Sequence, residues 1–246
     1  MKKKYVDINV DVGEGMGNES LILPLVSSCN IACGGHAGNT ATMQEVVRLA
    51  KMNDVKIGAH PSFPDKEHFG RLERNMPVND LFESLKQQIL NLQDVVLQEG
   101  ATLHHVKPHG ALYNMAAVKK TTAQVVINVI KALPFKVKLY VPYQSVIAKM
   151  AMQQQVAICY EAFADRAYNE DYTLVSRLQK GALITDSDVM FNHVYNMVFK
   201  QQVKTITGLN IPLQAHTFCV HGDNKNAVAL IEALKIKLEQ HNLYLK

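Results

Sequence analysis

The feature of this chain that most limits its fold is a regular alternation of short β-type runs with helical segments, continued almost from end to end. The segments between the runs carry apolar residues at a spacing of three and four, which indicates amphipathic helices. Strands that alternate with helices in this way pair in parallel, with the helices packed outside. Seven strands are predicted, over residues 5–12, 29–32, 55–59, 102–107, 137–141, 156–163 and 214–220.

The clearest helix is predicted over residues 79–99, where Asn79 is expected to cap the start and Gly100 to end the helix. A chain of 246 residues accommodates either one α/β barrel or two smaller domains. No Pro/Ser-rich linker, low-complexity segment or internal repeat interrupts the alternation. We therefore expect one domain that spans residues 1–246.

An open doubly wound sheet and a closed barrel both satisfy this alternation, and the position of the reactive residues separates them. A doubly wound sheet gathers its site near one switch point, whereas a barrel uses the carboxyl ends of all its strands. Almost every predicted strand here ends in a reactive residue, so an α/β fold with one distorted, seven-stranded, TIM-like β/α barrel is predicted. These residues are Asp11, Glu14, His36, His60, Lys107, His109, Asp165, Arg166, His221 and Asp223.

Apolar and polar residues also alternate with a period of two along the strands, which predicts an unusually polar barrel interior. In the first run Val6, Ile8, Val10 and Val12 share one face, and the other face is polar. Ordinary barrel interiors are layered Val, Ile and Leu, so a polar interior costs stability and calls for a functional explanation. The polar positions on this parity are Asp7, Asn9, Asp11, Asn30, His36, His60, His105, Lys107, His109, Glu161, Asp165 and His221. For Asp7, Asn9 and His105, deep hydrogen bonding without a chemical role is the simpler explanation.

Charge and hydropathy exclude several function classes. The net charge is +4, from 26 Lys and Arg against 22 Asp and Glu, and three of the lysines are residues 2–4. Nucleic-acid binding needs clustered basic residues interleaved with aromatic ones, and the chain lacks this pattern. No run approaches the roughly 18 apolar residues of a membrane span, and acidic residues interrupt the amino-terminal stretch that a signal peptide would need. A cytoplasmic protein with no nucleic-acid or membrane partner is expected.

The four cysteines do not indicate a disulfide scaffold in a chain of this length. Cys29, Cys33 and His36 suggest a zinc site, but four residues along a strand separate two sulfurs by roughly 13 Å. Cys29 and Cys33 are therefore expected to be small buried apolar residues.

Six motifs follow one another from residue 7 to residue 223: DINVDVGEGMG, CNIACGGHAGN, IGAHPSFPD with the trailing FGR, HVKPHGALYN, EAFADRAY and CVHGD. In this order, the six motifs closely resemble those of the LamB/YcsF family, which is also known as the family of the A-type 5-oxoprolinase subunit. The resemblance covers essentially the whole chain.

Five positions depart from the family's pattern. Gly35 stands where an aromatic residue is usual, and Asn39 replaces an acidic residue. Ser62 and Phe63 replace Gly-Tyr, and Leu72 follows Arg71 where a second Arg is common. The loss of the acid at Asn39 matters most if that loop touches a cation.

The resemblance implies a barrel related to the polysaccharide-deacetylase and glycoside-hydrolase architectures. It also implies ATP-dependent hydrolysis of 5-oxoproline (pyroglutamate) to L-glutamate, performed with two further subunits of the B and C types. ATP is then a co-substrate, and a divalent cation a further expected component. The glycine-rich GEGMG segment could cradle phosphate, but it lacks the Lys-Ser/Thr of a Walker motif.

Opening a five-membered lactam requires a base for water, donors for the oxyanion and cations for phosphate and carboxylate. Asp11 is the first choice of base, followed by Asp165 or Glu161. The expected catalytic residues are Asp11, His36, His60, Lys107, His109 and Asp165, and those expected to bind substrate or phosphate are Asn9, Glu14, Arg71, Glu161, Arg166, His221 and Asp223. Among the cations, Lys107, Arg71 and Arg166 are the natural anion binders.

Three alternatives stay open from the residues alone. A metal-dependent amide hydrolase, such as a carbohydrate deacetylase, would use Asp11, His36 and His60 as ligands. A binding or scaffolding subunit would need no catalytic residue, although the polar interior argues against this role. Asp165 and Arg166 could also form a purely structural ion pair. No role is assigned to His68, His193 or His241, which lie outside the motifs.

Overall fold

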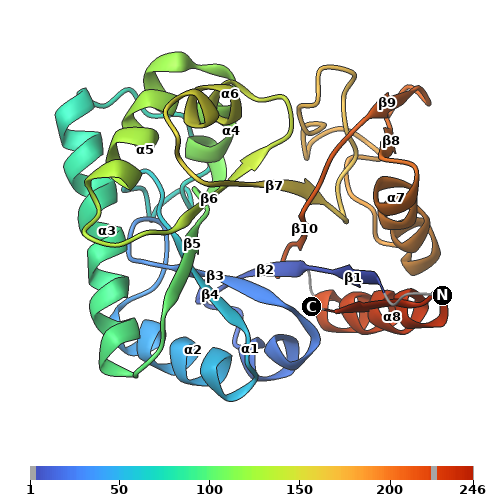
Figure 1. The fold of residues 1–246 in the computed structure, drawn as a ribbon, viewed down its shortest axis with the longest axis horizontal. Coiled ribbons are helices and arrows are strands. Elements are labelled where there is room, and N and C mark those ends of the chain that lie inside the picture. The colour runs from blue at the N-terminus through green and yellow to red at the C-terminus, as the bar shows by residue number, and fades with distance from the viewer. Residues whose placement is uncertain (1–3, 223–225, 246) are drawn as a thin grey trace.

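The computed structural model describes residues 4–222 and 226–245, and within them seven parallel strands close into a barrel (Figure 1). The strands run around the barrel in the order β10-β2-β3-β4-β5-β6-β7, which confirms the predicted fold class. Their bounds are β2 Ile8–Val12, β3 Ser28–Ala32, β4 Lys56–His60, β5 Leu103–Val106, β6 Lys138–Pro142, β7 Ile158–Phe163 and β10 Thr217–Val220.

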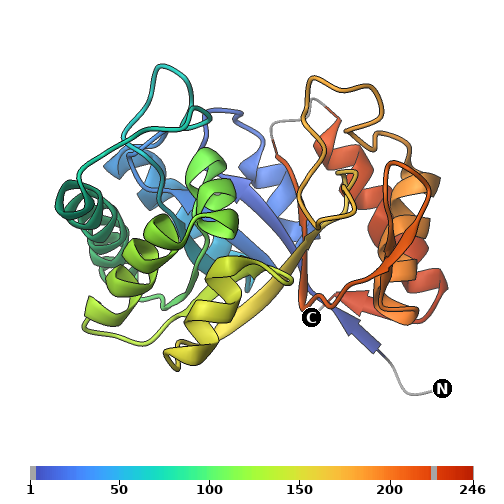
Figure 2. The ribbon, with the colours of Figure 1, turned by 90° about the horizontal axis from the view of Figure 1, so that it is seen from above.

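Helices cover the outside of the barrel in two groups, which Figure 2 shows on either side of the strands. The first group follows β2 to β6, and the second, α7 and α8, lies on the far side with the loops between β7 and β10. The helices are α1 Glu19–Ile22, α2 Thr40–Met52, α3 Val78–Gln98, α4 Gly110–Val118, α5 Lys120–Ala132, α6 Val146–Gln153, α7 Ser187–Phe199 and α8 Ala227–Gln240, and the short 3-10 helix η1 Leu23–Leu25 follows α1. No helix of the described residues combines the length and the hydropathy that crossing a membrane requires.

The longest predicted helix lies within one residue of its predicted bounds. Helix α3 begins at Val78 after Pro77, so Asn79 occupies the first turn and does not cap the helix. Its buried positions include Leu85, Ile89 and Leu92, which follow the predicted spacing and pack into the main core. The amphipathic pattern therefore determined both the helix and the face that it buries.

The first predicted strand is divided at Asp7. The part before it, β1 Lys4–Val6, leaves the barrel and pairs with β11 Leu243–Leu245, whereas the part after it is β2. The Asp7 carboxylate accepts hydrogen bonds from the hydroxyls of Ser28 and Thr217, 2.8 and 2.7 Å away. A second strand pair outside the barrel, β8 Gln202–Lys204 with β9 Asn210–Pro212, is antiparallel.

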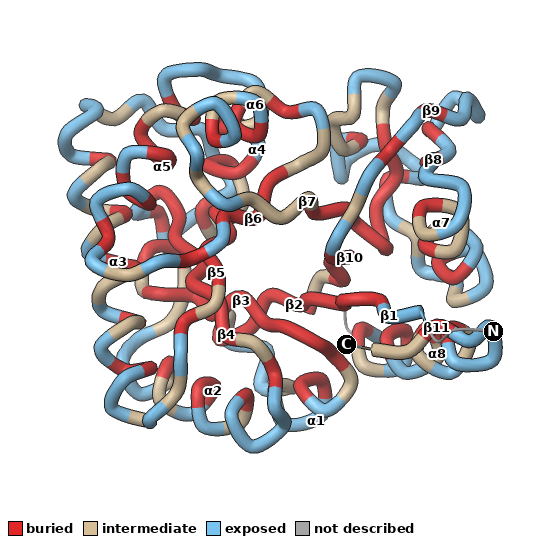
Figure 3. Tube along the Cα trace, viewed as in Figure 1, coloured by how far each residue is buried: buried red, intermediate tan, exposed pale blue. Residues whose placement is uncertain are grey.

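The barrel strands are mostly buried, as the red segments of Figure 3 show, except for the first half of β7 and the ends of β6. Val10, Val12 and Ile31 belong to one apolar core that also contains the inner faces of the helices. The alternate positions are polar and equally buried, including Asn9, Asp11 and Asn30. The predicted polar interior is thus confirmed, and each of its groups requires a partner because water does not reach it.

Gly58 is necessary for the packing of this interior. A Cβ atom at Gly58 would overlap the imidazole of His105 on β5. The His105 ring stacks on Tyr140 with centroids 3.9 Å apart, and its Nε2–H donates to Asn30 Oδ1 at 2.7 Å. Burial holds the pKa of His105 well below its usual value, so the ring is neutral. His105 is a satisfied structural group, as expected from the sequence.

Candidate functional site

The site is built on the carboxyl ends of six barrel strands, β2, β3, β4, β5, β7 and β10. Strand β2 carries Asn9 and Asp11, β4 ends at His60, and β7 carries Glu161. The turns that follow the strands supply Glu14, His36, Lys107, His109, Asp165 and His221. Because parallel strands in a barrel direct their carboxyl ends to one face, residues more than 200 positions apart in the sequence meet there.

Lys107 lies at the centre of the site. Its ammonium is 2.9 Å from Asp11 Oδ1, 2.9 Å from Glu161 Oε1 and 3.0 Å from Cys219 Sγ. Burial opposes its charge, but Asp11, Cys219 and Glu161 outweigh this penalty and raise the pKa of Lys107 well above its ordinary value. The side chain is therefore a permanently charged, almost fully buried cation.

Asp11 is held as an anion by its neighbours. Burial opposes ionisation, yet His60 and Lys107 together hold the pKa of Asp11 well below its usual range. Oδ1 accepts hydrogen bonds from Lys107 Nζ and, at 2.8 Å, from Asn30 Nδ2, whereas Oδ2 faces His60 Nε2 at 3.4 Å. One oxygen is thus occupied and the other is directed at the histidines.

The floor beneath Asp11 and Lys107 is an amide network. Asn30 Nδ2 also donates to Asn9 Oδ1 at 2.8 Å, and Asn9 Nδ2 donates to the Thr217 hydroxyl at 2.8 Å. Lys107 Nζ reaches Asn9 Oδ1 at 3.4 Å. Asn9 was expected among the substrate-binding residues, and the structure places it in this floor with its amide fully engaged, which agrees with the structural explanation.

His60 and His109 form the second part of the site. His60 Nδ1–H donates to the backbone carbonyl of Lys107 at 2.7 Å, and His109 Nε2–H donates to the carbonyl of Phe69 at 2.9 Å. These bonds fix both tautomers, so the remaining nitrogens, His60 Nε2 and His109 Nδ1, present lone pairs to each other across 2.9 Å. Two facing lone pairs are favourable only when a proton or a cation lies between them.

Glu14 and His36 complete a cluster of four potential ligands. His36 Nε2 lies 2.9 Å from Glu14 Oε1, which is also 3.4 Å from His109 Nδ1 and 3.9 Å from His60 Nε2. His36 stacks on His109 with ring centroids 3.7 Å apart. Burial lowers the pKa of His36 and lowers that of His109 further, so both favour the neutral form that binds metals.

The ligand atoms of Glu14, His36, His60 and His109 all lie within 4.8 Å of one another. The set expected from the sequence was Asp11, His36 and His60, and the structure replaces Asp11 with Glu14 and His109. Lys107 and Asn30 occupy Asp11 Oδ1, and Asp11 Oδ2 faces only His60, at 3.4 Å. A carboxylate and three imidazoles are a suitable donor set for Zn²⁺ or a similar divalent cation.

Asp165 and His221 make a separate pair at the barrel mouth. Both the backbone N–H and Nδ1 of His221 lie 3.0 Å from the Asp165 carboxylate. Burial opposes ionisation of Asp165, but His221 outweighs it and lowers the pKa of Asp165. Arg166 instead donates from Nη2 to the carbonyl of Val175 at 2.7 Å, and its buried Nε has no hydrogen-bond partner among the described residues. Arg166 therefore makes no direct ion pair with Asp165 among the described residues, although its charge still helps to lower the pKa of Asp165.

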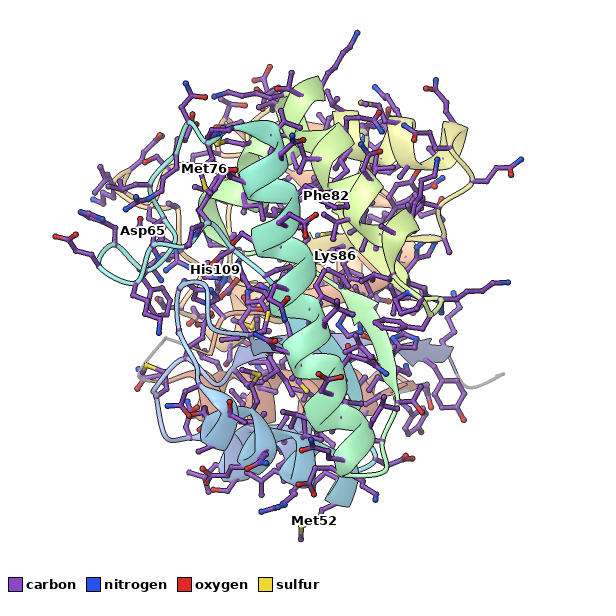
Figure 4. All side chains as sticks on the ribbon, turned by 90° about the vertical axis from the view of Figure 1, so that its left-hand side faces the viewer. Met52, Asp65, Met76, Phe82, Lys86 and His109 are labelled. Carbon is purple, nitrogen blue, oxygen red and sulfur yellow. The ribbon has the colours of Figure 1, made fainter. Side chains whose placement is uncertain are left out.

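The loop after β4 covers the histidine cluster. Asp65 anchors it by accepting a hydrogen bond from Arg74 Nη2 at 2.7 Å. This bond and, to a smaller extent, the bonds from His68 lower the pKa of Asp65 to about 2. Figure 4 shows Asp65 and His109 on the same side of α3. Arg71 lies on this loop, exposed, with its guanidinium 5.0 Å from the ring centroid of Phe69. Asp223, the remaining expected binding residue, lies outside the described residues.

Three of the positions that depart from the family's pattern have structural explanations. A Cβ at Gly35 would overlap both Ser62 and Gln88, so glycine at 35 and serine at 62 fit each other. Asn39 caps α2 by accepting a hydrogen bond from the Thr42 N–H at 3.0 Å. The Asn39 side chain is exposed at the start of α2, and its Oδ1 is engaged in this cap.

Two interior residues were not singled out from the sequence. Tyr113 lies inside the HVKPHGALYN motif, and its buried hydroxyl is close enough to Glu161 that burial and this carboxylate raise the pKa of Tyr113 well above its usual value. Cys219 lies beside Lys107, and burial raises the pKa of its thiol. The motif that contains Tyr113 was the available signal, whereas only the fold reveals the Cys219–Lys107 contact. Cys29 and Cys33 are free and buried, as expected.

The glycine-rich turn after β2 is partly occupied by the chain itself. The N–H of Gly13 donates to Glu19 Oε1 at 3.1 Å, so a carboxylate of the same chain already takes the first donor of this loop. Gly13, Gly15 and Gly17 all adopt positive φ angles, of 72°, 86° and 66°. These angles explain the glycines as turn residues without a bound phosphate.

Known proteins resemble this chain over nearly its whole length. The model of the LamB/YcsF family matches residues 6–246. A lactam utilization protein from Thermus thermophilus is 36% identical, with coverage of 98% of this chain and 99% of that one and a TM-score of 0.92. At 13% identity, a proposed cellobiose-phosphate cleavage protein from Enterococcus faecalis shares the fold, with a TM-score of 0.62 over 100% of this chain and 97% of that one. The chain belongs to the LamB/YcsF family.

Proposed function

We propose that this chain is the A-type subunit of a 5-oxoprolinase, which hydrolyses the lactam of 5-oxoproline to L-glutamate with ATP and two partner subunits. Family membership and the 36% identity to a lactam utilization protein support a role on a cyclic amide. The observation that carries the proposal is the buried Lys107 ammonium, held 2.9 Å from both Asp11 and Glu161 beside the histidine cluster. A fixed cation in a water-poor site is suited to an oxyanion.

The reaction requires that water add to the lactam carbonyl and that the C–N bond then break. In our proposal, transfer of the γ-phosphoryl group of ATP to the lactam oxygen releases ADP and activates the carbonyl carbon. Water then adds to this carbon, the C–N bond breaks to leave an acyl phosphate, and a second water releases phosphate and L-glutamate. Lys107 stabilises the negative charge of the phosphoryl group on this oxygen. When no cation lies between His60 and His109, His60 Nε2 is the base for water, because its Nδ1–H is fixed on the Lys107 carbonyl and Asp11 Oδ2 faces it at 3.4 Å.

Asp11 is the first choice of base from the sequence, and the geometry favours another role. Its Oδ1 is shared by Lys107 and Asn30, so Asp11 serves to hold the ammonium and to stabilise the imidazolium that forms when His60 accepts a proton. His221, oriented by Asp165, donates a proton to the leaving nitrogen. The Arg166 Nε, which has no partner within the described part of the chain, is a donor for the substrate carboxylate.

The test is glutamate formation from 5-oxoproline and ATP by this chain assembled with B- and C-type subunits. We expect turnover only in the complete mixture, and a loss of about 10²–10³-fold in Lys107→Met, the range seen when a transition-state charge partner is removed. Lys119→Met, which removes an exposed lysine, is the matched control. Absence of ATP-dependent turnover in the complete mixture would contradict the proposal.

A second function, a metal-dependent hydrolase that acts on the amide of a carbohydrate-type substrate, is favoured by the ligand cluster. A divalent cation held by Glu14, His36, His60 and His109 would polarise the substrate carbonyl. Acetate release from an N-acetylated oligosaccharide, without ATP or partner subunits, would support this function if a chelator stops it and Zn²⁺ restores it. No release with the metal-loaded protein would exclude it.

A further inference from the structure

The barrel contains a cavity at the end opposite the candidate site. The amino ends of β4, β5 and β6 and the turns before them line an open cavity of about 640 Å³. Its apolar wall includes Val55, Ile57, Leu103, Val137 and Ala157. A volume in this range accommodates a small organic molecule, and an apolar wall favours one with an apolar body.

Positive charge surrounds this apolar wall. Four lysines line the cavity, Lys51, Lys56, Lys136 and Lys138, against the single carboxylate of Asp54. Lys56 is paired with Asp7 at 2.9 Å, and Lys51 donates to the backbone carbonyl of Glu99 at 2.7 Å.

Two of the lysines are available to a ligand. Lys136 and Lys138 are exposed, and neither forms an ion pair with a carboxylate of the described residues. Lys138 Nζ lies 3.5 Å from Nε2 of His104, which also lines the cavity. An anion bound between these two ammonium groups would not need to break an existing ion pair.

A second cavity, of about 480 Å³, does not have this excess of unpaired positive charge. Among its lining residues, Lys119 lies 2.7 Å from Glu73, and Arg74 lies 2.7 Å from Asp65. Its cations are therefore neutralised by the protein itself. The excess of unpaired positive charge distinguishes the cavity at the amino ends of β4 to β6.

We propose that this cavity binds a small organic anion in which an apolar body carries a sulfonate, carboxylate or phosphate group. The apolar body packs against Val55, Leu103 and Val137, and the anionic group lies between Lys136 and Lys138. The ammonium groups remain at the water-exposed rim, so the anion gains their attraction without the full cost of burying them. This binding is independent of the reaction at the other end of the barrel.

The experiment uses two fluorescent probes that share one ring system and differ in a single sulfonate group. 8-Anilino-1-naphthalenesulfonate carries a sulfonate, and N-phenyl-1-naphthylamine has the same ring system without it. Titration of the full chain measures both dissociation constants in the wild type, in Lys136→Gln/Lys138→Gln and in Thr102→Trp, in which an exposed residue that lines the cavity is enlarged to fill it. Lys120→Gln/Lys149→Gln removes two exposed lysines outside the cavity and is the matched control.

We expect the sulfonate probe to bind more tightly than the neutral one. The Lys136/Lys138 variant should weaken only the sulfonate probe, by about tenfold for two exposed charge contacts. Thr102→Trp should weaken both probes, and the control pair should weaken neither. Wild-type affinity for the sulfonate probe in the Lys136/Lys138 variant would overturn the proposal, as would an equal loss in the control pair. Thermal unfolding of each variant verifies that it is folded.

Discussion

His60 Nε2 and His109 Nδ1 lie 2.9 Å apart, while the other nitrogen of each ring donates to a backbone carbonyl. This arrangement concentrates lone pairs between the two rings, and Glu14 Oε1 adds a carboxylate oxygen 3.4 Å from His109 Nδ1. The site is therefore prepared for positive charge, either as a shared proton or as a bound cation.

We predict that the wild-type protein binds Zn²⁺ and that His109→Ala weakens this binding by more than about 100-fold, because one ligand and its fixed geometry are lost. Isothermal titration calorimetry measures the affinity. His68→Ala is the control, because His68 has a partly exposed imidazole bonded to Asp65 outside the cluster. Equal zinc affinity in His109→Ala and the wild type would exclude a cation site at this cluster.

Lys107→Met is expected to destabilise the protein as well as inactivate it. The substitution leaves the buried carboxylates of Asp11 and Glu161 without their shared cation. Removing one partner of a buried ion pair costs about 3–5 kcal/mol. Urea unfolding measures this loss, and Lys119→Met, which breaks an exposed pair with Glu73, should cost less than about 1 kcal/mol. Similar losses in the two variants would show that the buried ion pairs of Lys107 stabilise the fold no more than an exposed pair does.

Gly58→Ala is expected to lower the free energy of unfolding by about 1–3 kcal/mol through overpacking, because the added methyl group would overlap His105. His105→Ala removes the ring that causes the overlap. In a double-mutant cycle the two substitutions should therefore cost less together than the sum of their separate effects. Strict additivity would mean that the methyl group added at position 58 does not meet the His105 ring.

His193 on α7 is expected to make the protein sensitive to mild acid. Burial lowers its pKa to about 4, and its buried Nε2 has no hydrogen-bond partner among the described residues. Below pH 6.5 the unfolded chain binds a proton at His193 that the folded chain does not bind until about pH 4. Stability is therefore complete above pH 6.5 and falls as the pH is lowered through this window, by up to about 3 kcal/mol.

His193→Gln should flatten this part of the stability profile relative to the wild type. Thermal unfolding followed by circular dichroism at pH 7.0, 5.5 and 4.5 measures the difference. His241→Gln, which alters an exposed histidine, should leave the profile unchanged. Parallel profiles for the wild type and His193→Gln would show that another group causes the acid sensitivity.

Much of the site could be predicted because barrel topology converts sequence position into spatial position. Strand ends marked by Asp11, His60 and Lys107 had to meet at one face once the strands were known to be parallel. Tyr113 was not singled out, because the HVKPHGALYN motif that contains it does not show that its hydroxyl lies near Glu161. The partners of Asp165 were also beyond sequence reasoning, since the adjacent Arg166 turns away and His221 approaches from β10.

The sequence alone determined the strand–helix alternation, the polar parity of the barrel interior and the set of reactive residues at strand ends, because hydrophobic periodicity is a local property. The tertiary structure decided which of these residues are partners. Strand register and the path of the turn after β2 place Glu14, not Asp11, beside His36 and His109. Contacts of this kind depend on the stagger of strands around a closed barrel, which no local pattern encodes.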